Sequence, residues 1–376
     1  MKERESSKMT NQSDWAETTM IAIQMYYTPV LVSLGTLGNC LSVYVFFYTK
    51  MRRASSSWYL AALVISDTGF LVAVFVVWLN MVGIGIFNLE GYCQFFVYLS
   101  TLCSFLSVWF VVSFTVERFI AVQYPLRRQS MCTVAKAKLV LTLITGIGVV
   151  LCSPVLWLTS PQPMQHKQNI TACLLVAERE NFANVFNAAD TILTFVLPFT
   201  VIVILNGLIS RTVWRLANVR RTLTTNGQSR DPKCGNIGVS QATVTKMLLV
   251  VSTVFLCFNL PAYVMRVRAF LEVHQDDPRS TVIAQHIANI LFDTNFGINF
   301  VLYCASGQNF RKAVVRLILR RPRRWHSGTP VSNHVSDVRR SSSKVARQRT
   351  IVYEVPWTEG CELREIESTT SRRLSQ

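Results

Sequence analysis

The stretch Glu117-Arg118-Phe119 lies near the end of a long apolar segment, residues 92–122. It places a carboxylate beside a guanidinium at the edge of a segment long enough to cross a bilayer as a helix. A charged pair at the boundary of hydrocarbon costs free energy, so such a pair is seldom present without a function. The stretch therefore indicates a membrane-spanning protein with a functional site at residues 117–119, near the end of this apolar segment.

Seven apolar segments are present in all, and each is long enough to cross about 30 Å of hydrocarbon as a helix. They cover residues 26–48, 58–82, 92–122, 135–158, 182–213, 243–270 and 282–304. Half of the 376 residues are hydrophobic and only 16% are charged, whereas a soluble domain carries roughly 25% charged residues. The sequence predicts an all-α membrane protein, with a seven-transmembrane helix bundle at 26–304 after a polar tail at 1–25.

The net charge of +17 comes from basic residues in alternate connections between the segments. Lys and Arg gather at 50–53, 127–138 and 211–246 and again after residue 320, whereas the connection 83–91 has none. By the positive-inside rule, the amino terminus is extracellular and the carboxyl terminus cytoplasmic in a multi-pass protein of the plasma membrane. Basic residues beside helix ends suit an anionic lipid bilayer, so we do not expect nucleic acid as a partner.

Two N-glycosylation acceptors, Asn11 and Asn169, fall on the outer side in this topology. Cys93 and Cys173 fall there as well. An oxidising exterior permits a disulfide that joins the start of the third segment to the second outer connection. The alternative is two unrelated thiols. The agreement of both acceptors with the charge rule supports an outer amino terminus.

The residues after the bundle divide into two parts. Residues 305–319 place Phe310 and Val314 at helical spacing, with Arg311 and Lys312 on another face. This pattern is typical of a short amphipathic helix on a membrane surface. Residues 320–376 are rich in Arg, Ser and Pro, which predicts a disordered cytoplasmic tail. Serines beside its arginines suit basic-directed kinases, and phosphate there would create a surface for a regulatory partner.

Asp67 lies in the middle of the second segment, so its carboxylate must face the bundle interior and find partners there. The candidate partners are Asn39, Ser113 and Asn299. Two interpretations stay open, a structural hydrogen-bond node and a sodium site. The sequence has no Walker loop, metal-ligand spacing or nucleophile motif, so it predicts neither an enzyme nor any other cofactor.

Polar residues near the outer ends of the segments predict a cavity that opens outward. The candidate ligand-binding residues are Gln94, Ser100, Asp190, Asn259, Tyr263, Arg266, His286 and Asp293. Two simpler interpretations stay open. Arg266 can extend to the membrane interface, as long basic side chains do, or it can form an internal salt bridge with Asp293. Either way, the cavity is expected to be polar.

Together these residues resemble the rhodopsin-like (class A) G-protein-coupled receptors over about 26–319. The resemblance rests on Gly38-Asn39, Leu63 with Asp67, Cys93 with Cys173, Glu117-Arg118-Phe119, Pro198, Phe255 with Pro261, and Asn299 with Tyr303 followed by Phe310. It implies that Arg118 reaches a heterotrimeric G protein in the active state and that Tyr303 swings inward. It also implies outward movement of the sixth helix, and receptor kinases and arrestin at the tail.

The chain departs from the family pattern at several of these places. Phe119 replaces a tyrosine, Asn259 a tryptophan and Phe300 a proline. Gln241 lies near the place of an acid that often holds the family's arginine from the sixth helix. Glu117 is then the main restraint on Arg118, and we expect measurable signalling without ligand.

The departures also argue against two classes of ligand, biogenic amines and retinal. Ser100 occupies the place of the aspartate in amine receptors, and Asp293 occupies the place of the retinal lysine in opsins. The sixth and seventh segments resemble those of invertebrate neuropeptide receptors, including the FMRFamide-type and CNMamide-type receptors. We therefore expect an extracellular peptide ligand. The alternatives are a class A receptor for a lipid or other small molecule and, more remotely, a transporter, for which the chain shows no internal repeat.

Overall fold

The structure is a computed structural model that describes residues 2–163, 171–225, 232–271 and 278–318. The predictions for the tail at 320–376 and for Asn169 lie outside the described residues. The same holds for predictions that depend on the side chains of Asn11 and Gln241.

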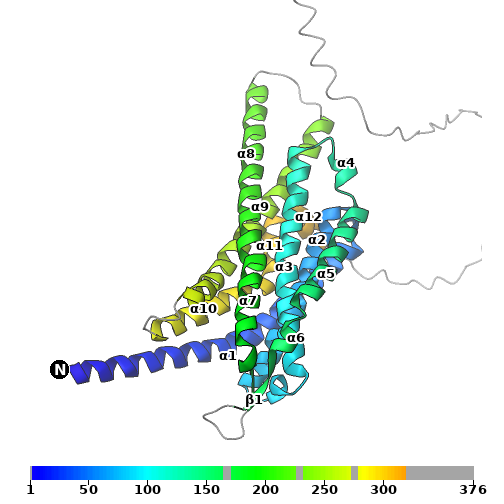
Figure 1. Cartoon of the computed structure of the whole chain (residues 1–376). Helices are drawn as coiled ribbons and strands as arrows, with labels where there is room; N and C mark the ends of the chain where they lie inside the picture. The colour runs from blue at the N-terminus through cyan, green and yellow to red at the C-terminus, as the bar shows by residue number, and fades with distance from the viewer. Residues whose placement is uncertain (1, 164–170, 226–231, 272–277, 319–376) are drawn as a thin grey trace, which may run out of the picture. The chain divides into compact units, whose positions relative to one another are not determined.

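Six helices in the described part of the chain are long and apolar enough to cross a membrane, and a bent pair of helices makes a seventh span. This confirms the predicted seven-transmembrane bundle (Figure 1). The spans are built from α1 (Lys2–Tyr48), α2 (Ser55–Met81), α3 (Tyr92–Gln123), α5 (Val134–Cys152) with α6 (Val155–Leu158), α7 (Glu180–Thr191) with the π-helical η4 (Ile192–Val196) and α8 (Leu197–Thr225), α9 (Pro232–Leu271), and α10 (Pro278–Gly297) with α11 (Asn299–Ser306).

Short elements connect or follow the spans. They are the 3₁₀ helices η1 (Lys50–Arg53), η2 (Gly85–Asn88) and η3 (Ala177–Arg179), the short helix α4 (Arg128–Met131), the strands β1 (Thr159–Pro163) and β2 (Thr171–Leu175), and the final helix α12 (Gln308–Ile318). The two strands form an antiparallel hairpin in which Pro161 pairs with Cys173. The sequence did not predict this hairpin. Helix α12 lies within the segment expected to form an amphipathic helix.

Helix α3 runs through the bundle and contacts α2, α5, α8 and α9 (Figure 1). Many large apolar side chains nevertheless point away from the packed interior. Leu34, Leu37 and Val150 are 66%, 68% and 70% exposed. Contiguous apolar surface of this kind is rare on a soluble protein, whereas a lipid solvent accepts it without cost.

The first helix begins at Lys2, within the stretch expected to be a polar tail. Residues 2–25 contain no Pro or Gly, the two residues that most disfavour a helix interior. The helical pattern of the first span therefore continues outward.

Prolines interrupt the spans in different ways. Helix α5 ends at Cys152, just before Pro154, and Pro198 follows the π-helical turn of the fifth span. Pro261 lies inside α9, where it removes one backbone hydrogen bond. The seventh span bends by 60° around Ile298 although it has no proline there.

Candidate functional site

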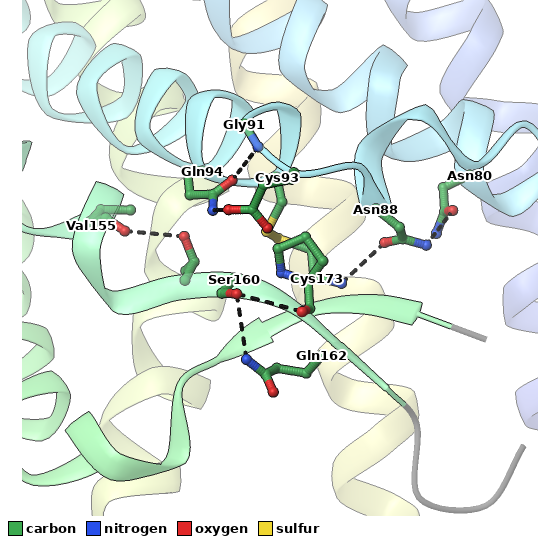
Figure 2. Close-up of a disulfide and its surroundings, with 12 residues drawn as sticks. Asn80, Asn88, Gly91, Cys93, Gln94, Val155, Ser160, Gln162 and Cys173 are labelled. Carbon is green, nitrogen blue, oxygen red and sulfur yellow. Dashed lines mark hydrogen bonds between the residues drawn. A yellow bond between two sulfur atoms is a disulfide. The ribbon is translucent and has the colours of Figure 1, made fainter. Parts of the chain in front are cut away.

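The β1–β2 hairpin lies at the outer end of the bundle, where a disulfide joins it to α3 (Figure 2). Cys93 and Cys173 form this bond with their Cα atoms 5.5 Å apart, which confirms the predicted pairing. The Cys173 backbone N–H donates to Asn88 Oδ1 at 3.1 Å, and Asn88 Nδ2 donates to Asn80 Oδ1 at 2.8 Å. The hairpin is thereby connected to the outer ends of both α2 and α3.

Gln94 was expected in the ligand cavity, but it lies at the start of α3 and caps that helix (Figure 2). The Gly91 backbone N–H donates to Gln94 Oε1 at 2.8 Å, and Gln94 Nε2 donates to Glu90 Oε1 at 2.6 Å. A glutamine three residues inside a helix often bonds back to the capping residue in this way. The position of the Gln94 side chain is therefore explained by its capping hydrogen bonds, without a role in ligand binding.

At the outer end of the bundle lie two adjoining cavities, called the two lobes of the outer cavity below, that share four lining residues: Phe70, Val97, Ser100 and Asn289. The larger lobe, of about 520 Å³, is lined by residues of α3, α7, α9 and α10 and of the hairpin. The smaller lobe, of about 250 Å³, is lined by residues of α1, α2, α3 and α10. An outward cavity is therefore present, with Ser100 in the wall of both lobes.

The larger lobe contains an ion pair between Asp190 and Arg266, with Arg266 Nη1 2.6 Å from Asp190 Oδ2. Of the two alternatives left open by the sequence, the pairing of Arg266 with Asp293 is not what the structure shows, and Asp293 lines the smaller lobe. The Arg266 side chain is 44% exposed and that of Asp190 is 14% exposed. The guanidinium therefore keeps one side open to the cavity.

Aromatic rings pack beside this ion pair in the larger lobe. Tyr263 is buried and stacks on Phe195 with ring centroids 4.5 Å apart. It also meets Phe199 and Phe292 edge to face. Aromatic packing of this kind gives the lobe a rigid wall that joins the fifth, sixth and seventh spans.

Three other predicted ligand residues lie apart from one another. Asn259 is buried and donates to the Phe255 carbonyl at 2.7 Å, and it lines neither lobe. His286 also lines neither lobe, and its Nδ1 lies 3.2 Å from Gln24 Oε1. Asp293 does line the smaller lobe. The outer cavity thus unites Ser100, Asp190, Tyr263, Arg266 and Asp293 but leaves out Gln94, Asn259 and His286.

Asp67 is fully buried at the centre of the bundle and accepts a hydrogen bond from Asn299 Nδ2 at 2.5 Å. The other two expected partners are occupied elsewhere. Asn39 donates to the Phe296 carbonyl at 3.0 Å, and Ser113 donates to the carbonyl of Trp109, one turn earlier in α3, at 2.8 Å. Of the three candidates, the structure joins only Asn299 to Asp67.

Ser107 is the residue of α3 that faces Asp67, and the sequence analysis missed it. It precedes Arg118 by eleven residues, or three helical turns, so both lie on the interior face of α3. Asp67 Oδ1, Asn39 Oδ1 and Ser107 Oγ are buried, and apart from the contact between Ser107 and the Asp67 carboxylate they have no polar partner among the described residues. Uncommitted oxygens of this kind are the ligands that hard cations prefer.

At the inner end, Glu117 and Arg118 are both buried and form an ion pair, with Arg118 Nη2 3.1 Å from Glu117 Oε2. The Ser55 hydroxyl at the start of α2 donates to Glu117 Oε1 and also to the Cys132 carbonyl. The Arg118 guanidinium lies 5.8 Å from the Phe114 ring centroid. Sequence analysis did not find Ser55, which anchors the carboxylate that holds the arginine.

Tyr303, the third residue predicted for the inner switch, is fully buried nearby in the seventh span. Its ring packs against Phe46 and Phe310, with centroids 5.5 Å and 5.6 Å apart. Its hydroxyl has no hydrogen-bond partner among the described residues. The structure therefore holds Tyr303 by ring packing and shows no hydrogen bond from it to the ion pair.

A cavity of about 1170 Å³ opens beside the ion pair, among η1, α2 and α12. Arg118 is in its wall, and the other basic side chains there are Lys50, Arg128, Lys312 and Arg316. A positively charged hollow of this kind attracts acidic groups of a partner.

Comparison with known proteins matches residues 38–303 to the sequence model described as 7 transmembrane receptor (rhodopsin family). The FMRFamide receptor of Drosophila melanogaster is 26% identical over 362 residues, which cover 87% of this chain and 62% of that receptor. The chain thus spans less than two thirds of that relative's length.

Vertebrate receptors are similar to the same extent. The thyrotropin-releasing hormone receptor of Gallus gallus is 25% identical over 77% of this chain and 76% of its own length. The growth hormone secretagogue receptor type 1 of Mus musculus is 26% identical over 77% of this chain and 78% of its own length.

Proposed function

The chain belongs to the rhodopsin family of seven-transmembrane receptors, and we propose that it binds an extracellular peptide and activates a heterotrimeric G protein. Members of this family are receptors and not enzymes. The name of one relative, the FMRFamide receptor, refers to an amidated peptide. The peptide ligand and the G-protein partner are carried over to this chain as part of the proposal.

The observation that carries the proposal is the two-lobed outer cavity with charged groups in its wall. Asp190 and Arg266 lie in the larger lobe, and Asp293 lies in the smaller one. Charged walls favour a ligand with complementary charged or polar groups over a plain hydrocarbon. A peptide end offers such groups, which is why we prefer a peptide to a lipid.

The proposed mechanism connects the outer cavity to the inner ion pair along α3. Cys93 and Arg118 are 25 residues apart in this helix, which corresponds to about 37 Å. Ligand bound at the outer end favours a state in which the sixth span moves outward and Arg118 is released from Glu117. Pro261 inside α9 supports a hinge there, because that helix lacks one backbone hydrogen bond.

The same proposal sets the orientation in the plasma membrane. A disulfide at the cavity end suits an oxidising exterior, and the basic cavity beside Arg118 suits the cytoplasm. Glycosylation at Asn11 and Asn169 belongs on the outer side. Receptor kinases and arrestin would act on the cytoplasmic tail.

A sodium ion at Asp67 is part of the proposal. The support is the presence of buried oxygens on Asp67, Asn39 and Ser107 that have no polar partner among the described residues outside this group. A bound cation would balance the buried carboxylate and stabilise the resting arrangement of the second, third and seventh spans.

The proposal is tested by expressing the full chain in cells and screening it against amidated neuropeptides, with calcium and cyclic AMP as the readouts. We expect at least one peptide to produce a saturable response that Arg118→Ala abolishes at equal surface expression. A response only to lipids would select the alternative ligand class. A transmembrane current without any G-protein response would contradict the receptor proposal.

A further inference from the structure

The smaller lobe of the outer cavity contains an acid that has no partner among the residues that the structure describes. Asp293 lines this lobe, and among the described residues it makes no hydrogen bond and no ion pair. A carboxylate that leaves water loses hydration, and a cation, hydrogen-bond donors or an added proton can each offset this loss. A cation that enters the lobe would therefore meet an acid that no described side chain neutralises.

The other acid of the outer cavity is already neutralised. Asp190 is paired with Arg266 at 2.6 Å in the larger lobe. A positively charged ligand group entering the larger lobe would meet the Arg266 guanidinium as well as the carboxylate. Of the two acids, only Asp293 offers negative charge that no described side chain compensates.

The lobe that Asp293 lines has both aromatic and polar side chains in its wall. The aromatic ones are Phe70, Trp78, Phe87 and Phe96, and the polar ones include Gln24, Thr28, Ser100 and Asn289. The faces of aromatic rings attract cations, by roughly 0.5–2 kcal/mol for each favourable contact. A wall with aromatic rings, polar groups and one carboxylate is suited to a guanidinium or ammonium group.

The size and position of the smaller lobe also suit one cationic side chain of a ligand that occupies the larger lobe. Its volume of about 250 Å³ equals that of about eight water molecules at ~30 Å³ each, enough for one side chain. It shares Ser100 and Asn289 with the larger lobe, so a ligand in the larger lobe can extend one group into it.

We propose that the smaller lobe is the subsite for a cationic ligand group, a guanidinium or ammonium on an apolar stem, with Asp293 as its counter-ion. This inference rests on the proposed function, because it names the chemical class of the ligand group that the same cavity receives. It also divides the cavity into two parts, with the cation in the smaller lobe and the remaining ligand beside Tyr263 and Arg266.

The test compares two probes that differ only in charge, N-acetyl-phenylalanyl-argininamide and N-acetyl-phenylalanyl-citrullinamide. Acetylation removes the α-amino charge, so the guanidinium is the only cation. Binding to the full-length protein in lipid nanodiscs is measured by surface plasmon resonance. We expect the arginine probe to bind at least about tenfold more tightly, a difference of ~1.4 kcal/mol. Equal binding of the two probes, or no binding, would overturn the inference.

Variants locate the subsite. Asp293→Asn should bring the ratio of the two affinities close to one, and Asp293→Glu should restore most of the preference because it keeps the charge. Glu90→Gln is the matched control, an acid outside both lobes, and it should leave the ratio unchanged. If Asp190→Asn removes the preference while Asp293→Asn does not, the cation binds in the larger lobe and the inference is wrong.

The experiments distinguish failure of this inference from failure of the proposed receptor function. Probe binding reports only on the outer cavity, whereas G-protein activation requires Arg118 at the other end. Charge-dependent binding without any signalling would contradict the proposed function alone. Peptide-stimulated signalling with equal binding of both probes would contradict this inference alone.

Discussion

Gly35 on α1 and Gly297 at the end of α10 meet backbone to backbone, so that a methyl group on Gly35 would lie 2.8 Å from the Gly297 Cα. A methyl group on Gly297 would in turn lie 2.6 Å from the Leu31 side chain. This close approach lies directly before the 60° bend of the seventh span. The absence of side chains at these two positions lets the bent span pack against α1 without a proline.

We predict that Gly35→Ala destabilises the bundle by about 1–3 kcal/mol, the usual cost of adding atoms to a packed interior, because the backbone of the neighbouring span cannot move aside easily. Gly297→Ala should cost less, because its methyl group meets the end of the flexible Leu31 side chain. Thermal unfolding of the purified variants and their surface expression in cells would measure the effect.

Gly146→Ala is the matched control, because nothing lies within 4 Å of a methyl group at that position of α5. It should be neutral or slightly stabilising, since alanine favours a helix by roughly 0.5–1 kcal/mol over glycine. If all three variants lost stability equally, the close packing of Gly35 and Gly297 would not be the cause.

If the Glu117–Arg118 ion pair restrains the receptor, variants that weaken it should signal more strongly in the absence of ligand. Glu117→Gln removes the negative charge that faces Arg118 at 3.1 Å, so basal G-protein activity should rise several-fold. Ser55→Ala removes the hydroxyl that holds the same carboxylate, and it should give a smaller rise. Arg118→Ala should lower basal activity below that of the unchanged protein. Nucleotide exchange in membranes, normalised to surface expression, measures all three.

Ser130→Ala serves as the control in this series, because that exposed hydroxyl donates only to the Arg127 carbonyl. Its basal activity should equal that of the unchanged protein. A basal signal that stays flat in Glu117→Gln at good surface expression would show that this ion pair does not restrain the receptor.

The node at Asp67 predicts that sodium stabilises the protein. At ten times its dissociation constant, sodium should add about 1.4 kcal/mol relative to choline at equal ionic strength. Asp67→Asn should remove this difference, and Ser107→Ala should reduce it, because both supply buried oxygens to the node. Thermal unfolding in sodium chloride and in choline chloride gives the comparison.

Ser113→Ala separates this prediction from a general effect of serine removal in α3. The Ser113 hydroxyl is bonded to the Trp109 carbonyl, so this variant should keep the full sodium effect. Loss of the sodium effect in Ser113→Ala but not in Ser107→Ala would place the ion elsewhere.

The disulfide predicts that the two single Cys→Ser variants lose surface expression and ligand binding to the same extent. Cys93→Ser and Cys173→Ser should each lower surface expression and ligand binding, because removing a disulfide typically costs about 2–5 kcal/mol. The double variant should be no worse than either single one. Cys257→Ser, at an exposed free cysteine, is the control and should behave normally in flow cytometry and binding assays. Normal ligand binding by Cys93→Ser at normal surface levels would contradict the prediction.

Much of the fold was predictable because membrane insertion depends on local composition. The segment predicted at 92–122 is α3, Tyr92–Gln123, whereas α1, α8 and α9 extend beyond the segments predicted for them. The Cys93–Cys173 bridge was also predictable, because the topology places only these two cysteines outside. The β1–β2 hairpin was not, since both strands have only five residues and β1 contains two prolines, which strands disfavour.

The hydrogen-bond and ion-pair partners of side chains within the bundle were less predictable than the spans. Ser113 was the expected neighbour of Asp67, but the rotation of α3 presents Ser107 instead. A salt bridge between Arg266 and Asp293 was one alternative left open by the sequence, but Asp190 is the partner of Arg266, from a position 76 residues earlier in the chain. Either acid is plausible by sequence, because both lie near the outer ends of spans.

The amino-acid sequence alone was sufficient for the seven spans, the disulfide and the receptor family, because transfer into lipid is summed over neighbouring residues along the chain. The tertiary structure decided which faces of the helices point inward, which of two acids is neutralised, and where a span bends without proline. These outcomes depend on how helices far apart in the chain approach one another, and the smallest side chains at the contact, as at Gly35 and Gly297, set that approach.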